Sequence, residues 1–599
     1  MTALSRVTFL ALVVATFGAF FVTQRLKRTP PPVNSVLATP LFSPNGDGRG
    51  NERARVSFTI KKDDDVTIDV VNEHGDRVAR IADGRAQRAY RRLSASWDGR
   101  DDAGRPVPDG TYRYRVALRR EGRTVTLPVS VVRDTTPPRP RVLSIGPTRS
   151  TAPSAELFPN RRGEPMRVRL FVPGRDARVL VYRTDIADPR LVLEREVPSG
   201  ETIWTWDGTD EDGSRLPSGT YVVVARSRDK AGNVGTSPSP LPPDPPYGRR
   251  LGGKGGVQIM SLAAAPPTAP VEATAKAEFL VVAAGRRYTW QVRRVGEPDP
   301  RSRGSGTRSR VTLRAPGGKS GLYLFEVRTE NRGVQVPFAV QSVRSERVLV
   351  VLPVTTWQGR NRFDDDGDGW PDTLEAGLPV RTARPYAGGT LPQGVSEHVG
   401  PLLAAIDRAG LRYDITTDVA LARGQGPRLR GHTGVVLAGD TRWMDAGVQR
   451  SLRSWVRDGG RLLQTGTDSL RRSARVTETG IERPTQPTQR DLFGARLQPV
   501  AAQPGVTLTN TVDRIGLFRG TDGVLGPFDS FEPTTGVGAD ERILAVASTP
   551  DAQHDVLVAS RYGDGVVVRL GLPDFAQRIS GDPELQTLLR RIWTLLQFR

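Results

Sequence analysis

A sixteen-residue pattern that occurs twice restricts the fold of this chain more than any other feature. The two copies occupy residues 97–112 (WDGRDDAGRPVPDGTY) and 206–221 (WDGTDEDGSRLPSGTY), so they begin 109 residues apart. Both match W-D-G-x-D-x-x-G-x-x-x-P-x-G-T-Y without a gap. Gly accepts positive φ and Asp hydrogen-bonds to its own backbone, so each copy favours a tight loop. The repeat therefore predicts two related modules.

Alternating apolar residues flank each copy, as in strands with one buried face. Val66, Ile68 and Val70 precede the first copy, and the second copy ends at Tyr221 and is followed by Val223. The Trp of each copy supplies a large anchor for a small core. We therefore predict two β-sandwiches of about 100 residues each, the size of an immunoglobulin-like domain. Their predicted bounds are 37–134 and 135–240.

These modules resemble the Ig-like domain first described in the flagellar hook-capping protein. The matching residues are Trp97, Asp98, Gly99, Pro108, Gly110 and Tyr112, then Trp206, Asp207, Gly208, Pro217, Gly219 and Tyr221. The opening FSPNGDGRGNE (42–52) and the segments DTTPP (134–138) and DKAGN (229–233) are also similar. The resemblance implies an Ig-like fold that serves spacing, display or assembly, and it carries no catalytic residues.

An uncharged run occupies residues 7–23, with basic residues on both sides. It predicts an N-terminal transmembrane helix, as a signal anchor or signal peptide over 1–28, followed by a linker over 29–36. The expected location is the cell membrane, with a single pass and the bulk of the chain extracytoplasmic. The protein is secreted if the leader is cleaved. The membrane is then a partner through this helix.

The strand pattern changes after a third β-sandwich, predicted over 257–344 behind a Pro/Gly-rich linker (241–256). The apolar runs at 347–353 and 434–437 indicate strands buried on both faces, and 461–465 is expected to be a further strand. Helices are expected between them, so the pattern predicts a mostly parallel sheet. The expected fold class is β-sandwich modules followed by an α/β flavodoxin-like or amidotransferase-like domain. That domain covers 345–599, with a β insertion at about 473–540.

The C-terminal part resembles the large subunit of N,N-dimethylformamidase. The segments that carry the resemblance are 320–328, 336–340, 348–361, 413–421 and 434–460. In that family an Ig-like segment precedes a domain related to class I glutamine amidotransferases, and the resemblance implies a metal-dependent amidohydrolase site.

The chain departs from that family at the site itself. Asp440 stands where the family has His, and Arg442 stands where an acidic or phenolic ligand is expected. Arg cannot ligate a cation, and the amidotransferase route needs a Cys, which the chain lacks. We therefore expect a non-catalytic domain. Asp440, Thr441 and Trp443 form the candidate cleft, because α/β folds bind ligands beyond the carboxyl ends of their strands.

The segment DDDGDGWPDTLE, which begins at residue 364, matches the twelve-residue calcium loop D-x-[DN]-x-[DN]-G-x₅-E. Calcium takes six to eight hard oxygen ligands, which alternate carboxylates supply. The predicted ligands are Asp364, Asp366, Asp368, the Trp370 carbonyl, Asp372 and Glu375. The alternative is a solvated acidic loop. A transition metal is not expected, because the four His are dispersed and Cys is absent.

The net charge of +21 arises from Arg residues scattered along the chain. Without a basic run, it predicts no specific nucleic-acid partner. The function predicted from the sequence is a membrane-anchored extracytoplasmic bacterial scaffold or binding protein with a structural calcium loop and a protein or polysaccharide ligand. Two alternatives stay open. One is a metal-dependent hydrolase of carbon–nitrogen bonds resembling N,N-dimethylformamidase, and the other is an adhesin for anionic cell-surface polymers.

Overall fold

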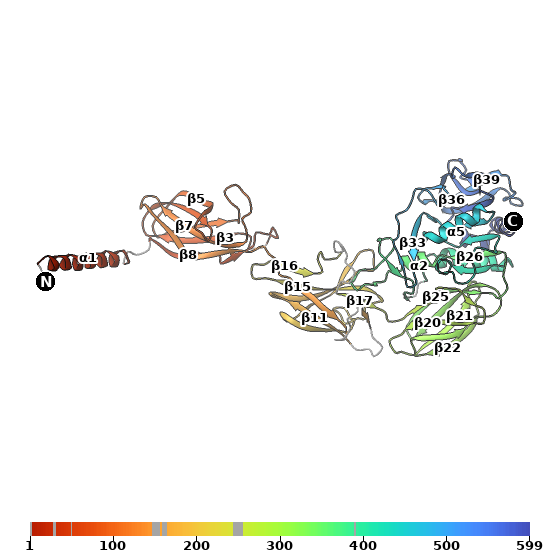
Figure 1. Ribbon diagram of the computed structural model, residues 1–599, viewed down its shortest axis with the longest axis horizontal. Helices are drawn as coiled ribbons and strands as arrows, with labels where there is room; N and C mark the ends of the chain where they lie inside the picture. The colour runs from red at the N-terminus through yellow and green to blue at the C-terminus, as the bar shows by residue number, and fades with distance from the viewer. Residues whose placement is uncertain are drawn as a thin grey trace.

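The computed structural model describes residues 3–27, 32–48, 51–146, 156–158, 165–242, 255–388 and 391–598. Residues 29–31 and 243–254, which belong to the two predicted linkers, lie outside the described residues. Helix α1 (Ala3–Lys27) is followed by two β-sandwiches in a row, and a third sandwich lies beside the C-terminal region, residues 345–598 (Figure 1). The structure is mostly β, with 46% strand and 14% helix.

Residues 33–133 form sandwich 1. One sheet has the order β1 (Val33–Ala38), β3 (Ala54–Ile60), β6 (Arg92–Trp97). The other has the order β2 (Leu41–Phe42), β8 (Arg123–Arg133), β7 (Gly110–Leu118), β4 (Asp64–Val71), β5 (Arg77–Gln87). Alternate side chains of β3 and β7 are buried, which gives the expected period of two. In the core, Trp97 packs edge-on against Tyr112 with ring centroids 4.9 Å apart.

Sandwich 2 follows at residues 141–259. Its smaller sheet has the order β14 (Gly200–Trp206), β11 (Met166–Val172), β9 (Arg141–Ile145). Its larger sheet has the order β10 (Glu156–Phe158), β17 (Gly256–Ile259), β15 (Gly219–Arg228), β12 (Arg175–Arg183), β13 (Arg190–Glu196), with β16 (Val234–Ser237) also paired to β15. The chain that follows the predicted linker therefore completes this sheet through β17.

The two copies of the repeated pattern form the same loop. In each, the Trp indole donates to a carbonyl three residues on, and the Tyr hydroxyl donates to a carbonyl four residues back. The bonds are Trp97 Nε1 to Arg100 O (2.8 Å), Trp206 Nε1 to Thr209 O (2.9 Å), Tyr112 Oη to Pro108 O (2.7 Å) and Tyr221 Oη to Pro217 O (2.8 Å). The local sequence thus dictates the loop geometry.

Asn233 joins sandwich 1 to sandwich 2. Its amide nitrogen donates to the carbonyl of Asp134 (2.9 Å), and its amide oxygen accepts from Asn45 Nδ2 (3.3 Å) and from the Ser43 hydroxyl. Ser43, which is buried, lies in the opening segment of sandwich 1. The Asn233 side chain thus contacts three groups at this joint.

Sandwich 3 lies beside the C-terminal region. One sheet has the order β23 (Arg310–Arg314), β20 (Lys276–Val282), β18 (Ala263–Ala265), β28 (Tyr386–Ala387). The other has the order β19 (Val271–Glu272), β25 (Arg332–Gln341), β24 (Gly321–Thr329), β21 (Tyr288–Arg294), β22 (Pro300–Gly306). Phe279 stacks on Phe325 in the core, with ring centroids 4.1 Å apart. The C-terminal region contributes β28 to this sandwich.

One large sheet organises the C-terminal region. Its order is β29 (Asp414–Thr417), β26 (Val348–Leu352), β30 (Gly434–Leu437), β32 (Arg461–Gln464), β41 (Gly565–Leu570), β40 (Asp555–Tyr562), β39 (Glu541–Ser548), β36 (Ala501–Asp513), β37 (Val524–Phe531). β35 (Arg496–Leu497) and β38 (Thr534–Gly536) pair beside it. The pairs from β29 to β41 are parallel, and those from β41 to β37 are antiparallel.

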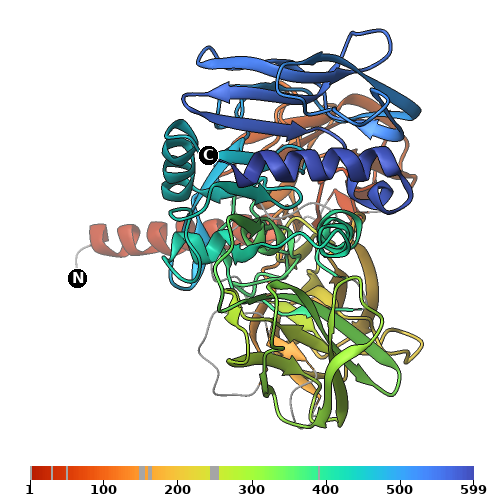
Figure 2. The same cartoon turned by 90° about the vertical axis from the view of Figure 1, so that its right-hand side faces the viewer.

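Helices cover both faces of the parallel strands. Val348 and Val350 pack in one core with α3 (Gly400–Arg408) and α7 (Pro583–Gln597), whereas Leu349 and Val351 pack with α5 (Ala446–Arg457). Figure 2 shows α7, in dark blue, lying along the sheet. The shorter helices are α2 (Val354–Arg360), η1 (Val395–Val399), α4 (Asp418–Ala422), α6 (Phe575–Arg578) and η2 (Ile579–Gly581). A small sheet has β27 (Val380–Arg381), β34 (Gly480–Glu482), β33 (Arg472–Val476) and β31 (Trp443–Asp445).

The predicted fold class is wrong. We expected a flavodoxin-like or amidotransferase-like α/β domain, but strands far outnumber helices and the large sheet is mixed. The reason lies in residues 473–540, which the sequence analysis set apart as an insertion. Their long strands β36 and β37 extend the same sheet in antiparallel order instead.

The predicted transmembrane helix, and with it the single-pass membrane location, is also contradicted. Within the described part of the chain, no helix combines the length and the apolar character that crossing a membrane requires. The uncharged run of α1 covers only residues 7–23, which is at the short end of the about 20 apolar residues that a spanning helix needs.

Candidate functional site

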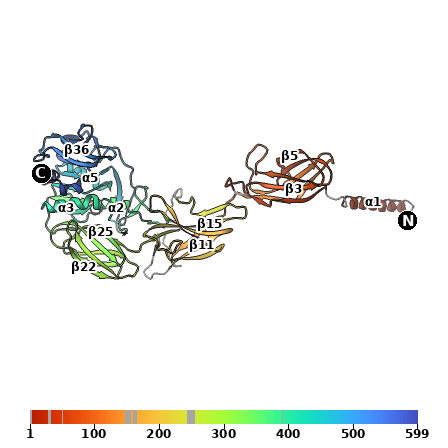
Figure 3. The same ribbon diagram turned by 180° about the vertical axis from the view of Figure 1, so that it is seen from behind.

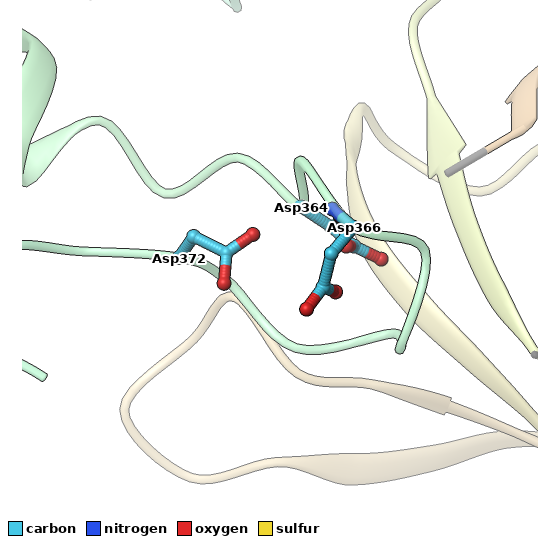
Figure 4. Close-up of side chains that lie close together, drawn as sticks. All are labelled: Asp364, Asp366 and Asp372. Carbon is cyan, nitrogen blue, oxygen red and sulfur yellow. Dashed lines mark hydrogen bonds between the residues drawn. The ribbon is translucent and has the colours of Figure 1, made fainter. Parts of the chain in front are cut away.

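The acidic loop, residues 364–372, brings three of the six predicted calcium ligands together. Carboxylate oxygens of Asp364, Asp366 and Asp372 all lie within 4.8 Å of one another. Figure 4 shows the three side chains converging from the two ends and the turn of the loop. Asp364 and Asp372 are buried, with 0% and 1% of their surface exposed. Burial of converging carboxylates is costly without a cation, so this cluster is the first candidate site.

Hydrogen bonds that backbone amides donate to nearby carboxylates fold the loop. Asp364 Oδ1 accepts from Gly367 N (2.7 Å), and its Oδ2 accepts from Gly369 N (2.8 Å). Asp372 Oδ2 accepts from Asp365 N (2.7 Å), which closes the loop across its base. Asp is suited to such turns because its short side chain reaches amides two to five residues away. The D-x-D-G spacing therefore favours the coiled backbone of the acidic loop.

Burial raises the pKa of Asp364 well above its ordinary value, and the negative charge of Asp368 adds to that rise. The amides of Gly369 and Gly367 oppose it, because their hydrogen bonds favour the charged carboxylate. A bound cation would act in the same direction as these amides. The electrostatics of the loop thus match a site that is completed by positive charge.

Of the three remaining predicted ligands, Glu375 lies apart from the cluster. Glu375 does not join the cluster, since its Oε1 pairs with Arg360 Nε at 2.9 Å and lies 4.0 Å from Arg442 Nη1. Asp368 is buried beside the group of three and accepts from Trp370 N (2.8 Å). The Trp370 side chain is buried as well, and a ligand role for its carbonyl stays a prediction. The loop therefore lacks the closing glutamate of the twelve-residue pattern.

Arg384 holds the acidic loop through an ion pair and hydrogen bonds, a role that the sequence did not predict. Its side chain is fully buried and pairs with Asp365 through Nε (2.9 Å) and Nη2 (2.5 Å). Its Nη1 donates to the carbonyls of Gln358 (3.1 Å), Asn361 (2.9 Å) and Asp372 (3.0 Å). Arg384 thus neutralises Asp365 and fixes both ends of the loop. No local pattern around residue 384 signals this role.

The loop also docks on sandwich 2. Gly256 N donates to Gly367 O (2.8 Å), and Thr184 Oγ1 donates to Gly369 O (2.6 Å). A Cβ at Gly256 would lie 2.3 Å from Asp364 Oδ2, and a Cβ at Gly369 would lie 2.5 Å from Val222 Cβ. Only glycine allows such close approach on both sides. The acidic loop is therefore a joint between sandwich 2 and the C-terminal region.

The candidate cleft residues follow β30 and have partners within the fold. Asp440 Oδ1 accepts from Thr467 N (2.8 Å) and lies 3.9 Å from His398 Nδ1. Thr441 is buried, and its backbone amide donates to Ser469 Oγ (3.0 Å). Trp443 is also buried, and the Arg472 guanidinium lies 5.3 Å from its ring centroid. Of the three, only Asp440 has an ionisable side chain of its own.

Glu532 is the titratable group that sequence reasoning missed here. It is buried, and its Oε1 accepts from Asp468 N (2.7 Å). Burial raises the pKa of Glu532 to about 8, and the charges of Asp468 and Asp440 add to the rise, while the Asp468 amide and Arg471 lower it. Glu532 is therefore largely protonated at neutral pH, beside the carboxylate of Asp440.

Two family models match parts of the chain. Residues 307–556 match the N,N-dimethylformamidase beta subunit-like C-terminal family. Residues 45–122 match the FlgD Ig-like domain family. Both matches confirm the resemblances predicted from the sequence. The second Ig-like copy and the relation to amidotransferases stay predictions. No curated protein matches the chain.

Solved structures match the chain only distantly. FlgD from P. aeruginosa is 20% identical over 20% of this chain and 84% of its own, with a TM-score of 0.13. A mutant of the GH42 beta-galactosidase Gan42B from G. stearothermophilus is 14% identical over 40% of this chain and 29% of its own, with a TM-score of 0.22. Domains A168–A170 of titin are 13% identical over 51% of this chain and 97% of their own, with a TM-score of 0.17. These likenesses carry no argument about function.

All the candidate residues lie inside the dimethylformamidase-like region, 307–556. The acidic loop lies near its start, Asp440 in its middle and Glu532 near its end. Arg442 lies between Glu375 (Nη1–Oε1 4.0 Å) and Asp468 (Nε–Oδ2 3.8 Å). The guanidinium at that position is an ion-pair partner of two carboxylates.

Proposed function

We propose that this protein is a multidomain binding scaffold in which a calcium ion, held by the acidic loop, fixes sandwich 2 against the dimethylformamidase-like region. The convergence of the Asp364, Asp366 and Asp372 carboxylates within 4.8 Å carries the proposal. The hydrogen bonds of the same loop to Gly256 and Thr184 support the joining role. The scaffold would present a surface to a protein or polysaccharide ligand.

The donor set favours calcium over a transition metal. The three groups that converge are carboxylates, which are hard oxygen ligands suited to Ca²⁺ or Mg²⁺. Ca²⁺ tolerates irregular geometry and takes ligands at about 2.3–2.6 Å, whereas Mg²⁺ demands a near-ideal octahedron. The loop folds through its own backbone amides, so backbone carbonyls and water can complete the coordination. Bound calcium would supply the charge that the buried aspartates need.

Calcium should stabilise the wild-type chain, and Asp366→Asn should remove most of that effect. Asn keeps the oxygen that accepts from Asp368 N, so the loop can still fold while one ligand charge is lost. Sites of this kind bind with a Kd of about 10⁻⁴ to 10⁻³ M, so calcium at about 100 times Kd adds about 2.7 kcal/mol. The measurement is urea unfolding of the full chain in calcium and in chelator.

The matched control is Asp540→Asn, an exposed aspartate of the same region. It should respond to calcium as the wild type does. Identical unfolding curves of the wild type in calcium and in chelator would refute the calcium site.

A second candidate function is amide hydrolysis. Two observations favour it, namely the family match over 307–556 and the buried Glu532 with its pKa near 8. A carboxyl group that stays protonated near neutrality can donate a proton to a leaving amine. The negative charge of Asp440 adds to this pKa rise and would help to keep Glu532 protonated.

The test is release of dimethylamine from N,N-dimethylformamide by the full chain loaded with metal. General acid catalysis contributes about 10²- to 10⁴-fold, so Glu532→Gln should lower kcat by at least about 10²-fold. The exposed Glu478→Gln should have no effect. If wild type and both variants release equal, background amounts of amine, this second function is excluded.

A further inference from the structure

A crevice of about 410 Å³ lies between sandwich 3 and the C-terminal region, away from both candidate sites. Sandwich 3 contributes the turn before β24 and the segment after β25, and the C-terminal region contributes the end of α3 and the loop that follows it. Figure 3 shows α3 and sandwich 3 next to each other. Small-molecule sites occur preferentially at such junctions between domains.

A buried network fixes the floor of this crevice. Arg294, whose side chain is 8% exposed, makes a bidentate pair with Asp407 (Nε–Oδ2 and Nη2–Oδ1, both 2.8 Å). Tyr413 Oη donates to the same carboxylate (3.2 Å), and Arg294 Nη2 donates to Ser320 O (2.7 Å). The Arg294–Asp407 pair crosses from sandwich 3 to α3. The crevice is therefore preformed, and the charge of Asp407 is already neutralised.

The rim of the crevice is positively charged. Lys319, Arg344 and Arg412 line it, and the acidic residues among the lining are Asp407 and Glu346. Glu346 lies 4.0 Å from Arg412, and Asp407 pairs with Arg294. Lys319 and Arg344 have no ion pair within the described part of the chain. Two cationic side chains thus remain available to a ligand at the mouth of the crevice.

Three apolar residues also lie among the lining of the crevice. They are Ala273, Val343 and Leu411, and the Val343 side chain is 75% exposed. They share the crevice with the cations Lys319 and Arg344. A ligand here would therefore meet both positive charge and aliphatic surface.

From this geometry we infer that the crevice binds a small organic oxyanion, in which a carboxylate or phosphate group meets Lys319 and Arg344 and an apolar moiety meets Val343 and Leu411. Arg would hold such a group in a bidentate manner, and Lys would add a point charge. The inference does not depend on the calcium loop or on Glu532, because none of their residues lines the crevice.

The test is calorimetric titration of the full chain with phenyl phosphate, benzoate and inorganic phosphate at about 0.15 M salt, which screens distant charges. Saturable binding of phenyl phosphate or benzoate at one site is expected, at least fivefold tighter than that of inorganic phosphate. The tighter of the two organic probes identifies the anionic group.

The double variant Lys319→Gln and Arg344→Gln should weaken that binding at least fivefold, while Arg328→Gln should leave it unchanged. All three residues are exposed, so the substitutions should not impair folding, and unfolding curves verify this. Equal weakening by Arg328→Gln would reveal general attraction to a basic protein and overturn the inference. Absence of saturable binding by the wild type would also overturn it.

Discussion

Arg569→Met should lower the free energy of unfolding of the C-terminal region by roughly 3–5 kcal/mol, as expected when one partner of a buried ion pair is removed. Arg569 Nε pairs with Asp491 Oδ2 (2.7 Å), and its Nη2 pairs with Glu541 Oε1 (2.8 Å). The three side chains are between 0% and 4% exposed. Met matches the aliphatic stem of Arg but leaves two carboxylates buried without a cation.

Urea unfolding of the full chain measures this effect, and two variants control it. Arg310→Met removes the exposed pair with Glu278 (2.8 Å) and should cost less than about 1 kcal/mol. Adding Asp491→Asn and Glu541→Gln to Arg569→Met should restore most of the loss, because the uncompensated charges are gone. A loss for Arg569→Met as small as that for Arg310→Met would contradict the argument.

Glu532→Gln should make the free energy of unfolding less sensitive to rising pH. The folded pKa of Glu532 is about 8, above the ordinary value of 4.5. Its contribution to stability is therefore fully present below pH 4.5 and is lost as the pH rises through 8. One pH unit within this window corresponds to about 1.4 kcal/mol. Between pH 5 and pH 7 the free energy of unfolding of the wild type should therefore fall by about 3 kcal/mol relative to that of the variant.

Unfolding in urea at pH 5, 6 and 7 measures this difference. Gln keeps an oxygen that can accept from Asp468 N, so the substitution preserves the hydrogen bond that positions the side chain. Glu478→Gln, at an exposed position, should follow the wild type at every pH. Parallel pH profiles of Glu532→Gln and the wild type would show that Glu532 is charged in the folded protein.

Local features of the structure follow from the sequence. The loops after Trp97 and Trp206 and the coil of the acidic loop depend on residues within seven positions of one another. Strand β30 is also evident as a short apolar run. Such elements are predictable because side chains and backbone groups of one short segment satisfy each other.

Features that depend on distant segments are not predictable in this way. Glu532 meets Asp468 across 64 residues, and Thr184 meets Gly369 across 185. β36 has a mostly exposed or intermediate burial pattern, so its composition does not show which sheet it joins. This uncertainty explains the error in the fold class. Glu375 fits the calcium pattern by spacing alone, but Arg360 holds its carboxylate away from the cluster.

The contacts of the acidic loop join sandwich 2, sandwich 3 and the C-terminal region into a closed circuit. Sandwich 2 leads into sandwich 3, β28 ties sandwich 3 to the C-terminal region, and the loop ties that region back to sandwich 2 through Gly256. Because each of these three bodies contacts the other two, none can rotate relative to its neighbour without breaking a contact to the third. Sandwich 1 stands outside this circuit and meets sandwich 2 around Asn233. A change of angle between sandwich 1 and the other three bodies is therefore expected at the Asn233 joint.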